Sequence, residues 1–168
     1  MKLNRQQRRD AARDAKRPHK PQRRLVINAH ALVTDLSRPY DPDDLMEEHN
    51  KMHLALVKLT EGIGTRDNFD RVSMLLNIGR IRAEAINPGL EQTIITGQQA
   101  MIRMKDRYDR GLNFGFDAEG RISVPAALDV YEALADASSP LQLRQARDLV
   151  LEIAGTHKFK ERGFVCPV

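Results

Sequence analysis

The sequence contains one cysteine, no tryptophan and few aromatic residues, which make up 5% of its 168 residues. A single cysteine, Cys166, excludes an internal disulfide and a cysteine-rich zinc site, and it favours a reducing compartment. Unbroken apolar runs are only a few residues long, whereas a helix needs about 20 apolar residues to cross a bilayer. These features predict a cytoplasmic protein with no membrane partner.

Basic residues are concentrated at the start of the chain. Residues 1–24 carry ten basic and two acidic side chains, a net charge of +8, while the other 144 residues carry 17 basic and 21 acidic side chains, a net charge of −4. Because each cation that neutralises a phosphate releases condensed counterions, nucleic acid or a nucleoprotein is the simplest partner. The alternative is a solubilising tail. The predicted nucleic-acid-binding residues are Arg5, Arg8, Arg9, Arg13, Lys16, Arg17, Arg23 and Arg24.

This basic arm, residues 1–24, has good helix formers but no apolar stripe. A short helix of this kind is marginal in water, so we expect a flexible, largely disordered arm that becomes helical on a partner. Pro18 and Pro21 would end such a helix. In composition the arm resembles the arginine-rich RNA-binding helices of phage antiterminators, which implies folding on RNA. The charge pattern itself leaves RNA and DNA both open.

The rest of the chain has apolar residues at helical spacing, bounded by glycine and proline. No alternating strand pattern is present, so we predict an all-α fold, an antiparallel bundle of five to six helices. The bundle is placed over residues 25–155, and residues 156–168 are assigned to a C-terminal tail. The predicted helices cover approximately 42–61, 66–86, 90–110, 124–137 and 140–154.

Residues 25–36 fit two assignments. Ala29, Leu32, Val33 and Leu36 would share one face of a short helix, whereas the apolar run 25–27 would suit a strand. The sequence leaves both open.

Two of the predicted helices have distinctive patterns. The helix over 66–86 is apolar on two sides, which predicts a central position with neighbours on more than one flank. The next helix carries a seam with 4-3-4-3-4 spacing, in which Gly97 would permit close approach of another helix. The residues of this seam are Leu90, Ile94, Gly97, Met101, Met104 and Tyr108.

His49 and His53 are the only pair with metal-ligand spacing, since residues four apart share a helix face. The sequence specifies no third ligand, and the pair does not form a His-Glu-x-x-His motif. We therefore interpret both as structural histidines. No dinucleotide, P-loop or nucleophile-elbow pattern is present, so we predict neither a cofactor nor an enzymatic activity.

Two further groups of residues each have two interpretations. Phe114 and Phe116 would stack on bases or, as we expect, cover one end of the bundle. Several arginines of the body would extend the basic surface, but Asp106 and Asp109 lie among them and favour an ordinary solvated face. These arginines are Arg80, Arg82, Arg103, Arg107 and Arg110.

The stretch 56–79 (LVKLTEGIGTRDNFDRVSMLLNIG), together with 126–131 (AALDVY) and 142–145 (QLRQ), resembles a group of small helical proteins of bacterial phages and prophages. The resemblance implies a non-structural accessory protein in the cytoplasm of an infected bacterium, and it assigns no role to any residue. We predict nucleic-acid binding through the arm. The alternative is a counter-defence or host-takeover module whose helical surface binds a host protein. The sequence leaves the oligomeric state open.

Overall fold

The computed structural model describes residues 42–154, 156 and 158–166. Apart from one isolated bridge between Gly64 and Phe114, all regular secondary structure in these residues is helical, which confirms the predicted all-α fold. The basic arm with its predicted binding residues, and the ambiguous segment 25–36, lie outside the described residues. The helices are α3 (Pro42–Thr60), α4 (Arg66–Ile86), α5 (Pro88–Asp109), α6 (Gly120–Asp136), α7 (Pro140–Ala154) and α8 (Lys158–Glu161).

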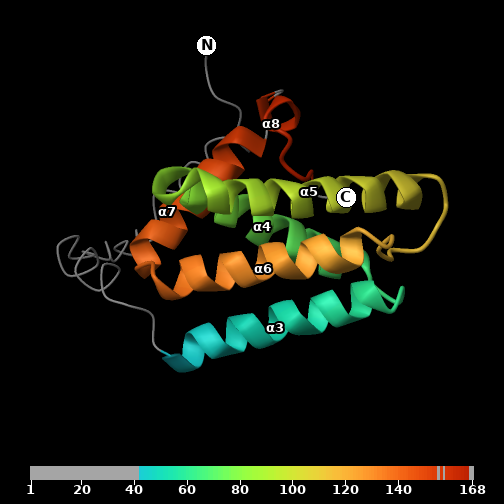
Figure 1. Cartoon of the computed structure of the whole chain (residues 1–168), viewed down its shortest axis with the longest axis horizontal. Coiled ribbons are helices and arrows are strands. Elements are labelled where there is room, and N and C mark those ends of the chain that lie inside the picture. Colours follow the sequence, from blue (N-terminus) through green and yellow to red (C-terminus); the bar gives the residue numbers. More distant parts are fainter. Residues whose placement is uncertain (1–41, 155, 157, 167–168) are drawn as a thin grey trace, which may run out of the picture.

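Helices α3 to α6 run in alternating directions, and α7 crosses one end of them (Figure 1). Helix α4 contacts α3, α5, α6 and α7, and its buried residues include Phe69, Leu76 and Ala83. The prediction of a central helix over 66–86 is therefore confirmed. α4 is the element on which the other four long helices assemble.

Side-chain caps fix where several helices begin. Thr65 and Asn68 form a reciprocal capping box at the start of α4, in which Asn68 Oδ1 accepts the Thr65 N–H at 3.0 Å. Asn87 alone separates α4 from α5: its N–H closes α4, and its side chain accepts the Gly89 N–H at 2.8 Å. The predicted capping box of α7 is confirmed, since Gln142 Oε1 accepts the Ser139 N–H at 2.9 Å. Such caps satisfy backbone groups that a helix end leaves free.

Helix α6 begins earlier than the sequence predicted. The expected start was near residue 124, but the helix begins at Gly120, whose N–H donates to Asp117 Oδ1 at 2.7 Å. Pro125 therefore lies inside the helix. Its missing N–H leaves one carbonyl, that of Arg121, without its usual helical partner. The cap at Asp117, which lies eight residues before the proline, sets the boundary.

The middle part of the α5 seam is buried in the core. Ile94, Met101 and Met104 are fully buried, and Gly97 lies where α5 meets α6. A Cβ atom placed on Gly97 would lie only 2.5 Å from the Ala127 Cβ. The predicted close approach of two helices at this glycine is confirmed.

Gly97→Leu is expected to destabilise the protein by about 1–3 kcal/mol, because a side chain there forces α5 and α6 apart. Thermal or urea unfolding measures the change. Gln99→Leu is the matched control on the same helix, at an exposed position, and should stay within about 0.5 kcal/mol of wild type. Equal stability of the two variants would contradict the packing described here.

The described part of the segment assigned to a C-terminal tail packs against the body. Phe159, Phe164 and Val165 are buried in the same core as the long helices. The ring centroids of Phe159 and Phe164 lie 5.3 Å apart. The segment 158–166 belongs to the packed body because its apolar side chains cover the surface of α4 and α7 that would otherwise face water.

Candidate functional site

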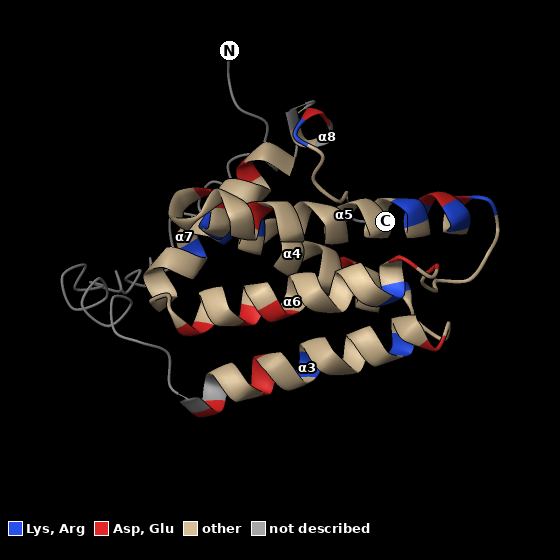
Figure 2. Ribbon diagram, viewed as in Figure 1, with Lys and Arg blue, Asp and Glu red and all other residues tan. Residues whose placement is uncertain are grey.

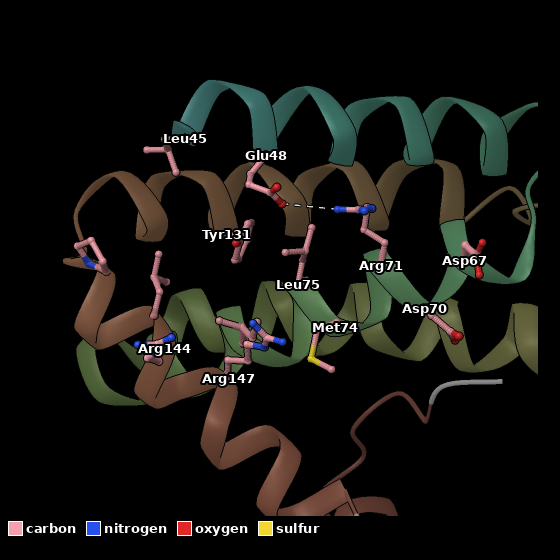
Figure 3. A pocket seen from close by; sticks show the side chains of 13 residues that line it. Leu45, Glu48, Asp67, Asp70, Arg71, Met74, Leu75, Tyr131, Arg144 and Arg147 are labelled. Atoms are coloured by element: carbon pink, nitrogen blue, oxygen red, sulfur yellow. Dashed lines mark ion pairs between the residues drawn. The ribbon is translucent and has the colours of Figure 1, made fainter. Parts of the chain in front are cut away.

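A groove of about 780 Å³ lies between α3, α4 and α7, with one contribution from α6 (Figure 3). We call it the α3/α4/α7 groove. It forms because α7 crosses the end of the bundle and leaves the face of α4 between α7 and α3 uncovered. The residues that line it are Leu45, Glu48, Asp67, Asp70, Arg71, Met74, Leu75, Ile78, Tyr131, Pro140, Leu143, Arg144 and Arg147.

The floor of the groove is apolar. Ile78, Tyr131 and Leu143 are buried, whereas Met74 and Leu75 remain partly exposed. Partly exposed apolar side chains in a concave surface are typical of a site that binds another apolar surface.

The two ends of the groove carry side chains of opposite charge. Arg144 and Arg147 project from α7 at the end where α3 begins, and Asp67 and Asp70 lie at the opposite end, near the start of α4 (Figure 3). Between these ends, Arg71 Nη1 pairs with a Glu48 carboxylate oxygen at 3.5 Å and links α4 to α3. The groove therefore has a basic end and an acidic end over one apolar floor.

His49 and His53 both face α6. His53 Nε2 lies 2.7 Å from Glu132 Oε1, and His49 Nδ1 lies 3.7 Å from the same oxygen. No sequence pattern indicated Glu132 as their partner, since the contact depends on how α3 packs on α6. No group of three or more histidine, cysteine or acidic side chains in the described part is arranged to hold a metal ion. The contacts support the interpretation as structural histidines that tie α3 to α6.

The purified protein is expected to contain no stoichiometric zinc, and a chelator should leave its melting temperature unchanged. The reason is that His53 Nε2 is already paired with Glu132 Oε1, so this nitrogen is not available as a metal ligand. Elemental analysis and thermal melting with and without chelator measure this, with protein exposed to zinc and then desalted as the control. One zinc per chain that survives desalting would contradict the structural role.

Most arginines proposed to extend the basic surface are engaged within the protein. Arg82 Nε donates to Ser138 Oγ at 3.1 Å. Arg103 Nε and Arg107 Nη1 donate to one oxygen of Asp117, at 3.1 and 3.2 Å. Figure 2 shows basic and acidic residues interleaved along this end of α5. These pairs support the interpretation as a solvated face.

Arg80 is part of a polar network that holds the C-terminal segment. Its guanidinium pairs with Glu91 at 3.2 Å, lies 5.0 Å from the Phe164 ring centroid, and donates to the Arg162 carbonyl. Asn77 completes the network with two hydrogen bonds to one residue, Val165: its amide donates to the carbonyl at 3.0 Å, and its oxygen accepts the N–H at 3.1 Å. The role of Arg80 is therefore structural.

The carboxylate of Asp117 holds the loop before α6 by accepting hydrogen bonds from Arg103, Arg107 and Gly120. Burial raises its pKa, but the hydrogen bond from Gly120 and the pairing with Arg103 and Arg107 outweigh burial, so the pKa lies below its ordinary value. A lowered pKa in the folded state means that the ionised group stabilises the fold at neutral pH and that this contribution is lost in acid.

Asp117→Asn is expected to destabilise the protein at neutral pH, because the asparagine keeps the cap but loses the charge pairs. The difference from wild type should be constant above the ordinary carboxyl pKa of about 3.9 and should shrink as pH falls through the lowered pKa of the folded state. Urea unfolding between neutral and acid pH measures it. Asp109→Asn, at the exposed pair with Lys105, is the control and should change stability little. A difference from wild type that persists unchanged in acid would contradict this role of the Asp117 charge.

The two phenylalanines of the loop lie inside the protein. Phe114 and Phe116 are buried, and Phe114 stacks on Phe69 and Tyr108 with centroid distances of 5.3 and 3.9 Å. The expectation that they cover one end of the bundle is confirmed.

Comparison of the chain with protein-family models, with curated proteins and with solved structures gave no match. The resemblance to small phage proteins therefore stays a prediction. Among the described residues, none of the helices combines the length and apolar character that crossing a bilayer requires.

Of the features singled out in the sequence, the structure brings His49 and His53 together with Glu132, and it gives most of the body arginines structural partners. The α3/α4/α7 groove has no counterpart in the sequence patterns.

Proposed function

We propose that this chain is a non-enzymatic accessory protein that binds nucleic acid or a nucleoprotein through its basic arm, residues 1–24. The observation that carries the proposal is the separation of charge, +8 on the arm and −4 on the remainder. The pairing of Arg82, Arg103 and Arg107 within the body supports it, because these cations already have protein partners. We therefore expect the arm to supply most of the cations that contact phosphates.

Within the arm, arginine would supply most of the contacts. Seven of its ten basic residues are arginines, whose planar guanidinium matches a phosphate with two parallel hydrogen bonds. The eight residues that we assign to this contact are Arg5, Arg8, Arg9, Arg13, Lys16, Arg17, Arg23 and Arg24.

We further propose that the protein acts inside a bacterium that carries a phage or mobile element. The resemblance of residues 56–79 to small phage proteins supports this context. A cationic arm on an acidic body is suited to binding a phosphate backbone without sequence-specific contacts.

The proposal is tested by fluorescence anisotropy with a labelled RNA hairpin and a labelled DNA duplex, at 50 and 200 mM salt. The intact protein should bind, with an affinity that falls steeply with salt, and deletion of residues 1–23 should abolish binding. Circular dichroism of both proteins checks that the helical body is retained. Equal binding by the truncated protein, with its helicity intact, would contradict the proposal.

A second candidate function, a protein-interaction module that binds a host protein, is favoured by the outer face of α3. Met46, Leu54 and Val57 lie on one side of this helix and are 59%, 57% and 49% exposed. Exposed apolar side chains along one helix face are typical of surfaces that bind another protein. The partner would present a complementary apolar strip.

Leu54→Glu combined with Val57→Glu tests this second function. The double variant should lose a host protein that the wild type captures from bacterial lysate, both before and after nuclease treatment. Ile122→Glu is the matched control, since Ile122 is also an exposed apolar residue, on α6. Capture that disappears with nuclease would instead favour the nucleic-acid proposal.

A further inference from the structure

We propose that the α3/α4/α7 groove binds an amphipathic helix of a partner protein, with acidic side chains at the end of that helix beside α7. This inference goes beyond the proposed function and does not depend on it. The site is also distinct from the outer face of α3, because none of the exposed apolar residues of that face lines the groove.

The groove exposes a stripe along one face of α4. Arg71, Met74, Leu75 and Ile78 line it at spacings of three, one and three residues, and Asp67 lies one turn before them. From the first to the last of these residues the helix rises about 17 Å, or about three turns. Met74 and Leu75 remain partly exposed, so an apolar partner that covers them would remove their surface from water.

The walls of the groove favour a helical partner. They are formed by α3, α4 and α7, and a helix uses its own N–H and C=O groups internally. An extended strand would therefore find no backbone partners, and its own polar groups would lie unpaired on the apolar floor. A helix satisfies its backbone by itself and presents only side chains, which is how amphipathic helices bind in apolar grooves.

Several charged side chains of the groove are already stabilised within the protein. Glu48 pairs with Lys51 at 3.0 Å and with Arg71 at 3.5 Å. Asp70 also has partners. Asp67 lies in the first turn of α4, where the positive end of the helix dipole stabilises a carboxylate. None of these groups calls for a charge on the occupant.

Arg144 and Arg147 differ, since within the described residues neither makes a hydrogen bond or an ion pair. Both are exposed on α7, and Figure 3 shows them at the end of the groove where α3 begins. A guanidinium binds a carboxylate with two parallel hydrogen bonds, so aspartate or glutamate of the occupant is the complementary group. A phosphate backbone would pair with the arginines but would leave Met74 and Leu75 uncovered.

Selection from a displayed library of helical peptides, with the full-length protein as the target, tests the inference. The selected peptides should have apolar residues at spacings of three or four and aspartate or glutamate near one end. A fluorescent synthetic peptide of the selected sequence should bind in an anisotropy titration, and its addition should shift the methyl NMR signals of Met74 and Leu75. Selection of basic or unpatterned peptides, or no enrichment, would overturn the inference.

Arg144→Glu combined with Arg147→Glu should weaken binding of this peptide about tenfold or more, because attraction becomes repulsion. Arg110→Glu combined with Arg121→Glu is the matched control, with the same change in net charge at exposed positions outside the groove, and should bind like wild type. Met74→Gln, which changes no charge, should also weaken binding. Circular dichroism checks that each variant stays helical. Wild-type affinity in the groove variants would overturn the inference and would assign the acidic peptide to the basic arm.

Two further results would assign the groove to another occupant and overturn the inference. The first is self-association of the free protein in sedimentation experiments that Arg144→Glu combined with Arg147→Glu abolishes, which would indicate a second copy of the chain. The second is a shift of the Met74 and Leu75 methyl signals on addition of a DNA duplex or an RNA hairpin, which would indicate nucleic acid.

Discussion

Met101→Ala is expected to destabilise the protein by about 2–5 kcal/mol, the largest stability effect predicted here. Met101 is fully buried on the seam of α5, between Gly97 and Met104. Truncation would remove most of its apolar contacts and leave a cavity that the surrounding helices fill only in part. For a protein of this size each kcal/mol lowers the melting temperature by about 2–4 °C. Thermal and urea unfolding measure the loss.

The matched control is Met46→Ala, the same change at a methionine that is 59% exposed on α3. It should alter the free energy of unfolding by no more than about 0.5 kcal/mol. If both alanine variants melt at the wild-type temperature, the seam of α5 is not packed in the core as the structure describes.

Replacing Arg5, Arg8, Arg9 and Arg13 by glutamine is expected to remove most of the affinity for nucleic acid. If the arm makes six phosphate contacts, wild-type binding should weaken roughly a thousandfold between 50 and 200 mM salt. The quadruple variant should show a shallower dependence, by about one logarithmic unit for each contact removed. Anisotropy titrations over a range of salt concentrations measure both quantities.

Arg110→Gln combined with Arg121→Gln is the control for this variant, since both arginines are exposed on the body. It should preserve the salt dependence. A quadruple variant that keeps wild-type affinity and slope would mean that the arm is a solubilising tail, and the interaction-module function would then be preferred.

The sequence predicted local structure where short-range chemistry determines it. Helix α4 has the predicted bounds because Gly62 ends the preceding helix and Thr65 begins the next. The capping box at Ser139 could also be predicted, because its two partners, Ser139 and Gln142, lie only three residues apart in the sequence. The position of Gly97 followed from the spacing of the apolar residues around it.

Features that depend on distant contacts were missed. Phe159 and Phe164 belong to no periodic apolar pattern, and the hydrogen bonds that hold this segment join Asn77 to Val165, 88 residues away. The partner of His49 and His53, Glu132, lies on another helix. The α3/α4/α7 groove is a property of how three helices cross, so no single stretch of sequence encodes it.

The docking of the C-terminal segment has a consequence for the order in which the chain matures during synthesis. Asn77 and Gln98 are buried and bonded to each other at 2.8 Å, and Arg80 lies beside them. While the ribosome has not yet released residues 158–166, these polar groups lack the backbone atoms of Arg162 and Val165 that complete their network. A buried polar group without its partner costs about 1–3 kcal/mol. The nascent body therefore reaches its full stability only after residues 158–166 have left the ribosome and docked, and until then α4 presents an incomplete surface to chaperones and proteases.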